Sequence, residues 1–248
     1  MGDELPASDF TVCVCTYNSS PTLRPCLEGV RAALPSARLL VVDHRSSDGT
    51  AGIARDFGAE VHFESTGLGY ARQLCFDLAR TRFVAFVDSD VLLADPRFFR
   101  AASDVLGCPR YGAVVGMSAG HRLAYGLPAG LLVLRKADFA AKSIPSYIDA
   151  RETFFIQRRL SELGLRTVYV ADAMVHRSGY RRFKPEWEGA NTRLLGGFKE
   201  MWYALKVIVL LTFNSHGVRN FLYIPVFYAK FIRGFLDPGR WRRMPRGD

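Results

Sequence analysis

Two aspartates one residue apart, Asp88 and Asp90, are the side chains of this 248-residue protein best suited to chemistry. They follow the apolar run from Phe83 to Val87, which predicts a buried strand. Two carboxylates at a strand end can turn to one hard cation, and Mg²⁺ or Mn²⁺ takes a few protein carboxylates together with substrate oxygens. The pair therefore predicts a metal site that holds a diphosphate, with a solvated strand end as the alternative.

Polar side chains also follow two earlier apolar runs. The first run is followed by Thr16, Tyr17 and Asn18, and the second is closed by Asp43. Ligands of open α/β sheets bind beyond the carboxyl ends of the strands, so we expect these residues to share one crevice with the two aspartates. Asp43 lies where a nucleoside would be recognised, whereas helix capping is sufficient to explain the serines that follow it.

Arg72 lies one turn into a predicted helix whose start carries Gly67 and Gly69. A guanidinium near a helix start is a suitable ligand for a phosphate oxygen. The glycine spacing differs from GxGxxG, so it does not indicate a dinucleotide site, and two glycines before a helix are also typical of a plain turn.

Glu152 precedes Ile156 by four residues and Leu163 by eleven, which predicts a carboxylate on the inward face of an amphipathic helix. A carboxylate on an apolar face is costly unless it is paired or functional. Two interpretations follow: a catalytic carboxylate, or an ion pair with an arginine near Arg151 or with Arg159.

The elements that must position these residues alternate short β-rich runs with helical patterns. This alternation predicts an α/β fold with a mostly parallel sheet flanked by helices on both faces. The predicted strands are 10–15, 39–42, 60–64, 83–87, 113–117, 130–134 and 166–170, and the predicted helices are 22–33, 49–57, 68–79, 96–106 and 150–163. Residues 172–176 continue after the last of these strands.

Composition and charge limit the class of protein. With 49% hydrophobic residues the chain is too apolar for disorder, and five cysteines without CxxC spacing favour neither a zinc site nor a disulfide frame. Apolar runs stop short of the roughly 18 residues of a spanning helix, and the acidic N-terminus does not resemble a secretory signal. We therefore expect a cytoplasmic protein.

The C-terminal segment differs from the rest in charge. Residues 198–248 hold 9 basic and 3 acidic side chains, a net +6 of the total +9. Two apolar helical stretches, 198–213 and 218–236, predict an amphipathic helical appendage that binds an anionic membrane surface at its cytosolic face. Packing on the catalytic domain or a dimer contact is the alternative. We expect a catalytic domain over 1–197, with no linker before 197, and the appendage over 198–248.

Together the motifs resemble the inverting family 2 glycosyltransferases with the GT-A fold. The resemblance covers about residues 10–180, and its matching segments are 15–18, 41–50, 67–73, 86–90, Glu152 with the helix after it, and 169–176. It implies a hexosyltransferase type of enzyme that displaces a nucleoside diphosphate from a sugar donor with the help of Mn²⁺ or Mg²⁺.

The resemblance also implies a role for each candidate residue. Thr16, Tyr17, Asn18, Asp43, Asp88 and Ser89 would contact the nucleotide, Arg72 the diphosphate or donor sugar, Asp88, Asp90 and His176 the metal, and Glu152 the acceptor hydroxyl as general base. Taken by itself, His176 predicts only a surface histidine.

Two residues depart from the family pattern. His44 stands where a second acid often accepts a hydrogen bond from a uracil ring, which leaves the donor base open. Thr153 replaces one acid of the later acidic pair, which slightly favours a phosphate acceptor because that oxygen is already ionised. The acceptor is expected to be lipid-linked, such as a polyprenyl phosphate, or a saccharide.

Other functions fit less well. A sugar-nucleotide pyrophosphorylase would need a lysine-bearing phosphate loop after the first strand, which residues 16–20 lack. A non-catalytic membrane-bound scaffold would not need both Asp88 and Asp90. No nucleic-acid partner is expected, because only the high net charge points to one. The oligomeric state stays open.

Overall fold

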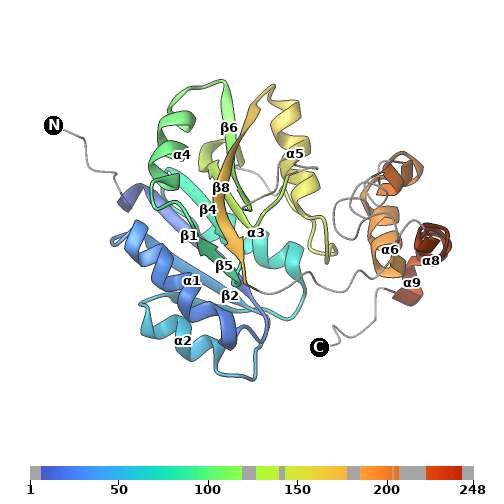
Figure 1. The fold of residues 1–248 in the computed structure, drawn as a ribbon, viewed down its shortest axis with the longest axis horizontal. Coiled ribbons are helices and arrows are strands. Elements are labelled where there is room, and N and C mark those ends of the chain that lie inside the picture. The colour runs from blue at the N-terminus through green and yellow to red at the C-terminus, as the bar shows by residue number, and fades with distance from the viewer. Residues whose placement is uncertain are drawn as a thin grey trace. The chain divides into compact units, whose positions relative to one another are not determined.

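The computed structural model describes residues 7–118, 127–139, 143–177, 185–202, 204–206 and 222–241. The chain packs into two units, Met1–Tyr147 with Glu152–Gly179 and Ile148–Arg151 with Tyr180–Asp248 (Figure 1). The division falls before helix α6 (Pro185–Gly196), earlier than the boundary expected from the sequence at 197, because α6 packs on helix α8 (Ile224–Leu236).

The first unit is built on a sheet whose described strands run in the order β3-β2-β1-β4-β7-β6-β8-β5. The strands are β1 Phe10–Thr16, β2 Arg38–Asp43, β3 Glu60–Phe63, β4 Phe83–Val87, β5 Val91–Leu93, β6 Tyr111–Ser118, β7 Leu131–Arg135 and β8 Arg166–His176. Pairing is parallel for β1 with β2 and β4, for β2 with β3 and for β6 with β8. It is antiparallel where β7 meets β4 and β6, and where β5 meets β8. The α/β class and the mostly parallel sheet are confirmed.

Helices cover both faces of this sheet (Figure 1). They are α1 Ser20–Ala33, α2 Thr50–Asp56, α3 Leu68–Leu78, α4 Phe98–Gly107 and α5 Thr153–Glu162. Because neighbouring strand residues point to opposite faces, Phe83 packs with α1, α2 and α4 in one core cluster and Val84 packs with α3 and α5 in the other. Parallel strands buried on both faces need apolar residues at nearly every position, and β4 is fully buried.

The structure corrects the predicted helix around Glu152. Helix α5 begins at Thr153, so Glu152 precedes the helix as its N-cap residue. Leu163 follows the helix and is exposed, so the inward stripe expected from spacing ends at Leu160.

The second unit is helical in its described parts. It contains α6, α8, α9 (Pro238–Trp241) and a helical stretch over 198–202 and 204–206. The backbones of helices α6 and α8 lie in close contact at two glycines. A Cβ added to Gly189 would meet Phe231 O, and one added to Gly234 would meet Glu186 O. Of the predicted helices 198–213 and 218–236, residues 207–221 lie outside the described residues. Within the described chain, no helix has the length and apolarity to cross a bilayer.

Candidate active site

A buried arginine connects two carboxylates at the carboxyl edge of the sheet, the edge at which β1, β2, β4 and β8 end. Arg72 on α3 is 3% exposed; its Nε donates to Glu152 Oε1 over 2.8 Å and its Nη2 donates to Asp88 Oδ1 over 2.9 Å. The guanidinium also lies over the ring of Phe86, 4.8 Å from the centroid. Burial lowers the pKa of Arg72, but the two carboxylates outweigh burial and raise the pKa above its ordinary value. The side chain therefore stays charged.

Glu152 is paired with this arginine and not with one near it in sequence. It is 5% exposed. The two arginines considered from the sequence contact other groups: Arg151 donates to Glu188, and Arg159 donates to the backbone oxygen of Asp138. Two residues expected at one site from separate motifs are thus in direct contact.

Asp88 and Ser89 lie in the loop between β4 and β5. The Asp88 side chain is 40% exposed, and its backbone N–H donates to Gly130 O over 2.9 Å. Ser89 Oγ donates to Ser19 Oγ over 3.0 Å, which ties this loop to the loop after β1. Asp88 therefore contacts the buried arginine on one side and solvent on the other.

Asp90 and His176 are neighbours at the same edge. Asp90 Oδ1 and His176 Nδ1 are 3.4 Å apart, because antiparallel pairing of β5 with β8 sets Val91 opposite His176. The hydrogen bond with Asp90 raises the pKa of His176 and outweighs burial, which lowers this pKa. Gly130 backs the imidazole, since a Cβ there would lie 2.9 Å from His176 Cε1. The surface histidine expected from sequence alone has a carboxylate partner.

The predicted metal ligands are only partly brought together. Asp90 contacts His176, whereas Asp88 Oδ1 accepts from Arg72. In the described part of the chain, no three His, Cys, Asp or Glu side chains form a group that could hold a metal by themselves. Carboxylate and imidazole donors fit Mn²⁺, and both Mn²⁺ and Mg²⁺ suit carboxylates. Mg²⁺ in particular is usually bound through one or two carboxylates plus substrate phosphates. The donor types therefore fit a cation held jointly with a diphosphate.

Thr16 and Asp43 face each other at the ends of β1 and β2. Thr16 Oγ1 donates to Asp43 Oδ2 over 2.7 Å, and the N–H and Oγ of Ser46 donate to the same carboxylate over 2.7 and 2.6 Å. Asp43 is 0% exposed, so its carboxylate shapes the loop after β2. Its contact with a nucleoside stays a prediction.

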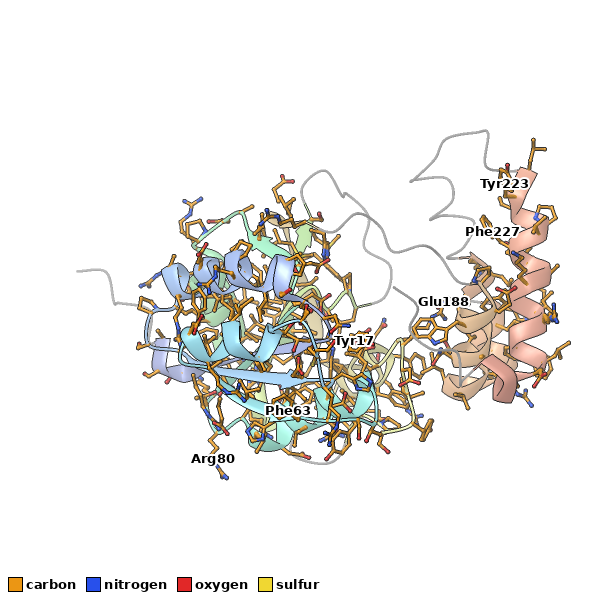
Figure 2. All side chains as sticks on the ribbon, turned by 90° about the horizontal axis from the view of Figure 1, so that it is seen from below. Tyr17, Phe63, Arg80, Glu188, Tyr223 and Phe227 are labelled. Carbon is orange, nitrogen blue, oxygen red and sulfur yellow. The ribbon has the colours of Figure 1, made fainter. Side chains whose placement is uncertain are left out.

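Tyr17, labelled in Figure 2, and Asn18 form the loop after β1. The Tyr17 side chain is partly exposed and meets the ring of His44 edge to face, with centroids 5.4 Å apart. Asn18 has φ of 46°, its N–H donates to Ser46 Oγ over 2.8 Å, and its Oδ1 accepts from the Ser47 N–H over 3.1 Å. Asn18 thereby joins the loops after β1 and β2. The rings of Tyr17 and His44 on these loops are partly exposed.

One residue of this edge was not singled out in the sequence. Glu64 follows β3, is buried, and its Oε1 lies 2.5 Å from His44 Nδ1. Its Oε2 accepts from the N–H groups of Thr66 and Gly67 over 2.6 and 2.8 Å, so it links the β2 loop to the start of α3. The only sequence signal was its position at a strand end just before the glycines.

Comparisons with known proteins match part of this chain to one family and one curated relative. Residues 11–121 match the family described as Glycosyl transferase family 2. EpsH of Bacillus subtilis (strain 168), a curated relative assigned as a glycosyltransferase, is 33% identical over 94 residues. That match covers 35% of this chain and 27% of EpsH, so it spans about a quarter of the curated relative.

Solved structures share the fold at low identity. The mannosyltransferase PcManGT from Pyrobaculum calidifontis, in complex with GDP-Man and Mn²⁺, has a TM-score of 0.64 at 16% identity and covers 94% of this chain and 73% of its own. S. aureus TarS 1–349 in complex with UDP-GlcNAc has a TM-score of 0.63 at 18% identity, and the match covers 92% of this chain and 80% of the TarS chain. Glucosyl-3-phosphoglycerate synthase from Mycobacterium tuberculosis, with Mn²⁺, UDP and glucosyl-3-phosphoglycerate, has a TM-score of 0.54 at 17% identity and covers 70% and 75%. The expected GT-A fold is confirmed.

Proposed function

We propose that this chain, whose residues 11–121 match the family described as Glycosyl transferase family 2, transfers a sugar from a nucleoside diphosphate sugar to an acceptor. The observation that carries the proposal is the contact of the buried Arg72 with Glu152 and Asp88, beside the Asp90–His176 pair. A buried cation between two carboxylates at the carboxyl edge of an α/β sheet is typical of a site that handles charged ligands.

The edge has an inner and an outer set of residues. The inner side chains are buried and hold one another: Thr16, Asp43, Arg72 and Glu152. The outer side chains are partly exposed: Tyr17, His44, Asp88, Asp90 and His176. We infer that the outer set meets the donor, with the Tyr17 and His44 rings at the nucleoside and the aspartates at the ribose and diphosphate. Arg72 orients both carboxylates and makes this edge less negative for the diphosphate.

A divalent cation fits the diphosphate end of this edge. Asp90 and His176 are the residues that would hold Mn²⁺ or Mg²⁺, and the ion would neutralise charge on the departing nucleoside diphosphate. PcManGT was solved with Mn²⁺ and GDP-Man, and TarS with UDP-GlcNAc, which supports a nucleoside diphosphate sugar as donor and leaves its base to a test with several donors.

Glu152 decides how the acceptor reacts. A hydroxyl must lose its proton during attack, and Glu152 is the carboxylate that we assign to remove it. A phosphate acceptor is already ionised, and in that case Glu152 serves only to hold Arg72. Attack from the face opposite the leaving group would invert the anomeric carbon.

The second unit supports a lipid-linked acceptor at an anionic membrane. Helix α8 packs on α6 through one face, while its opposite face is exposed and carries both apolar and basic side chains. Leu222 before the helix and Leu236 at its end are 83% and 70% exposed. The exposed apolar side chains on and next to this face are Leu222, Val226, Ile232 and Leu236, with Lys230 and Arg233 among them. Apolar side chains with flanking cations suit the boundary between lipid headgroups and acyl chains.

The experiment that tests the proposed function is release of nucleoside diphosphate from a panel of UDP-, GDP-, CDP- and dTDP-sugars with lipid phosphate and saccharide acceptors. We expect one donor to turn over only with Mn²⁺ or Mg²⁺. Release of inorganic pyrophosphate from a nucleoside triphosphate and a sugar phosphate would favour a pyrophosphorylase, and no turnover with any donor would favour a scaffold.

A further inference from the structure

His44, the residue after strand β2, is held at one ring nitrogen by a buried carboxylate. Its Nδ1 lies 2.5 Å from Glu64 Oε1. The Glu64 side chain is 2% exposed, whereas the His44 side chain is 27% exposed. An ionised carboxylate has acceptors only, so the proton of this contact belongs to Nδ1. Glu64 therefore selects the form of the ring in which Nδ1 is protonated.

Glu64 is itself fixed by the backbone around it. Its Oε2 accepts from the N–H groups of Thr66 and Gly67 over 2.6 and 2.8 Å, at the start of α3. Its own N–H donates to Asp43 O over 3.0 Å, which ties it to the end of β2, one residue before His44. The carboxylate is thus held from two segments, and this leaves Oε1 for the imidazole.

The second ring nitrogen of His44 reaches solvent. In the described part of the chain, His44 Nε2 makes no hydrogen bond. The one buried side-chain N or O atom without a partner there belongs to Asp138, so Nε2 is accessible. The partly exposed Tyr17 ring meets the imidazole edge to face. Nε2 and the Tyr17 ring are therefore presented together, at the place to which the proposed function assigns the nucleoside.

The form of the ring decides which bases Nε2 can bind. A neutral imidazole protonated at Nδ1 has a lone pair on Nε2, so Nε2 accepts a hydrogen bond and cannot donate one. Uracil, thymine and guanine have a ring N–H on their pairing edge, whereas cytosine and adenine have a ring nitrogen acceptor there. Two acceptors that face each other leave both without a partner, which is costly in a binding site.

We propose that Glu64 is a positioning residue: it holds the proton on His44 Nδ1, so that Nε2 accepts a hydrogen bond from a ring N–H of the donor base. The base is then uracil, thymine or guanine, and cytosine and adenine are disfavoured. Recognition of the base rests on the proposed function, whereas the form of the His44 ring depends on no substrate.

The first test needs no ligand. In the full chain labelled with ¹⁵N-histidine, two-bond ¹H–¹⁵N correlations show which ring nitrogen carries the proton. The His44 signal is assigned by its loss in His44→Gln. At pH 8.5, where an ordinary imidazole is neutral, we expect the proton on Nδ1. A proton on Nε2, or protons on both nitrogens, would overturn the proposal.

Glu64→Gln should reverse the form of the ring, because the two ends of an amide differ. The N–H groups of Thr66 and Gly67 need an acceptor, so the amide oxygen takes the place of Oε2 and the NH₂ group faces His44 Nδ1. Nδ1 must then accept, and the proton moves to Nε2. An unchanged ring in Glu64→Gln would overturn the role of Glu64.

Glu60→Gln is the matched control for this substitution. Glu60 also pairs with a histidine, His62, with Oε1 and Nε2 2.7 Å apart, but this pair lies on β3 and is partly exposed. The variant should leave the His44 signal unchanged. A reversal of the His44 ring in Glu60→Gln would show that the effect is not specific to Glu64 and would overturn the proposal.

The second test measures the Kd of nucleotides with Mn²⁺ by calorimetry. UDP is compared with CDP and GDP with ADP, because each pair has rings of the same size. In the pair that binds, we expect the nucleotide with the ring N–H to bind about tenfold more tightly. In Glu64→Gln, Nε2 donates, so this preference should disappear or invert. An unchanged preference would overturn the proposal.

The double variant separates an effect through His44 from a general effect on the site. When His44→Gln is already present, adding Glu64→Gln should change the preference by less than about twofold. An equal change with and without His44 would overturn the proposal. If none of the four nucleotides binds the unaltered protein, the proposed function fails and recognition of the base fails with it. The NMR result then decides by itself whether Glu64 sets the form of the ring.

Discussion

Arg72 and Glu152, 80 residues apart in sequence, form a buried ion pair in which Nε donates to Oε1 over 2.8 Å. Burying two charges costs much of what their attraction gains, so such a pair is weak evidence for stability by itself. It is stronger evidence that the two side chains must be charged and fixed at this place. The same arginine holds Asp88, so one buried cation sets the position of two carboxylates at the carboxyl edge.

The first prediction concerns the loss of this cation. Arg72→Met leaves Glu152 buried without a partner, and breaking a buried pair in this way typically costs about 3–5 kcal/mol of unfolding free energy. Turnover should be abolished as well. Urea unfolding measures the stability, and Arg24→Ala is the control because its pair with Asp56 is exposed and such pairs contribute about 0.2–1 kcal/mol. Equal losses of unfolding free energy in Arg72→Met and Arg24→Ala would show that the buried contacts of Arg72 contribute no more than an exposed ion pair.

The second prediction separates a hydroxyl acceptor from a phosphate acceptor. Glu152→Gln should lower kcat by roughly 10² or more with a hydroxyl acceptor, since general base catalysis contributes about that much. The KM for the donor should change little, because the outer residues that meet the donor are unchanged. Steady-state kinetics checks this. Near-normal kcat would mean that Glu152 is structural or that the acceptor is a phosphate.

The third prediction concerns Asp48 in the loop after β2. Burial raises the pKa of Asp48, but hydrogen bonds from Thr50 and Ser20 outweigh it and lower the pKa to about 2. A carboxylate with a lowered pKa stabilises the fold above its unfolded pKa, and this stabilisation is lost as the pH falls through the folded value. Asp48→Asn should therefore lower the Tm at pH 5–7, and the difference in Tm between the variant and the unaltered protein should narrow on acidification towards about pH 2. A difference in Tm that widens in acid would contradict the lowered pKa of Asp48.

The fourth prediction concerns the exposed face of α8. Val226→Glu with Leu236→Glu puts charge on this face without touching the buried Phe231 and Phe235. Flotation of the full chain with anionic vesicles should fall strongly in this variant, and Ala229→Glu, also exposed, should reduce it as well. Flotation that is unchanged, or absent in the unaltered protein, would favour a soluble acceptor or a protein partner for this face.

Much of the fold could be predicted because buried parallel strands leave a strong signal. Runs such as Phe83 to Val87 are apolar at every position, and the structure places strand β4 over these residues. The direction of β7 could not be predicted, since an apolar run reads alike in either direction and only long-range pairing with β4 and β6 decides it. Helix α6 contacts α8 through the backbone at Gly189, so it does not need a continuous row of apolar side chains. Its sequence therefore shows no clear apolar stripe at helical spacing.

The placement of several candidate residues at one edge of the sheet could be predicted, and their contacts could not. The rule that ligands bind at carboxyl ends brought Thr16, Asp43 and Asp88 to one edge, and the structure has them there. The sequence near Arg72 or Glu152 carries no local signal that the two side chains pair. An ion pair between α3 and the residue before α5 depends on how the whole sheet is assembled. The contact of Glu64 with His44 was missed for the same reason, since His44 follows a different strand.

The measurement that tests the account most directly is a thermal-shift panel of UDP, GDP, CDP and dTDP, with and without Mn²⁺, on the unaltered protein and on Asp90→Ala. A ligand at 100 times its Kd adds about 2.7 kcal/mol, which for a chain of this size raises the Tm by roughly 5–10 °C. We predict such a rise for at least one nucleotide with Mn²⁺ and loss of its metal-dependent part in Asp90→Ala. No rise with any nucleotide, or the same metal-dependent rise in Asp90→Ala, would contradict a metal-assisted nucleoside diphosphate site at this edge.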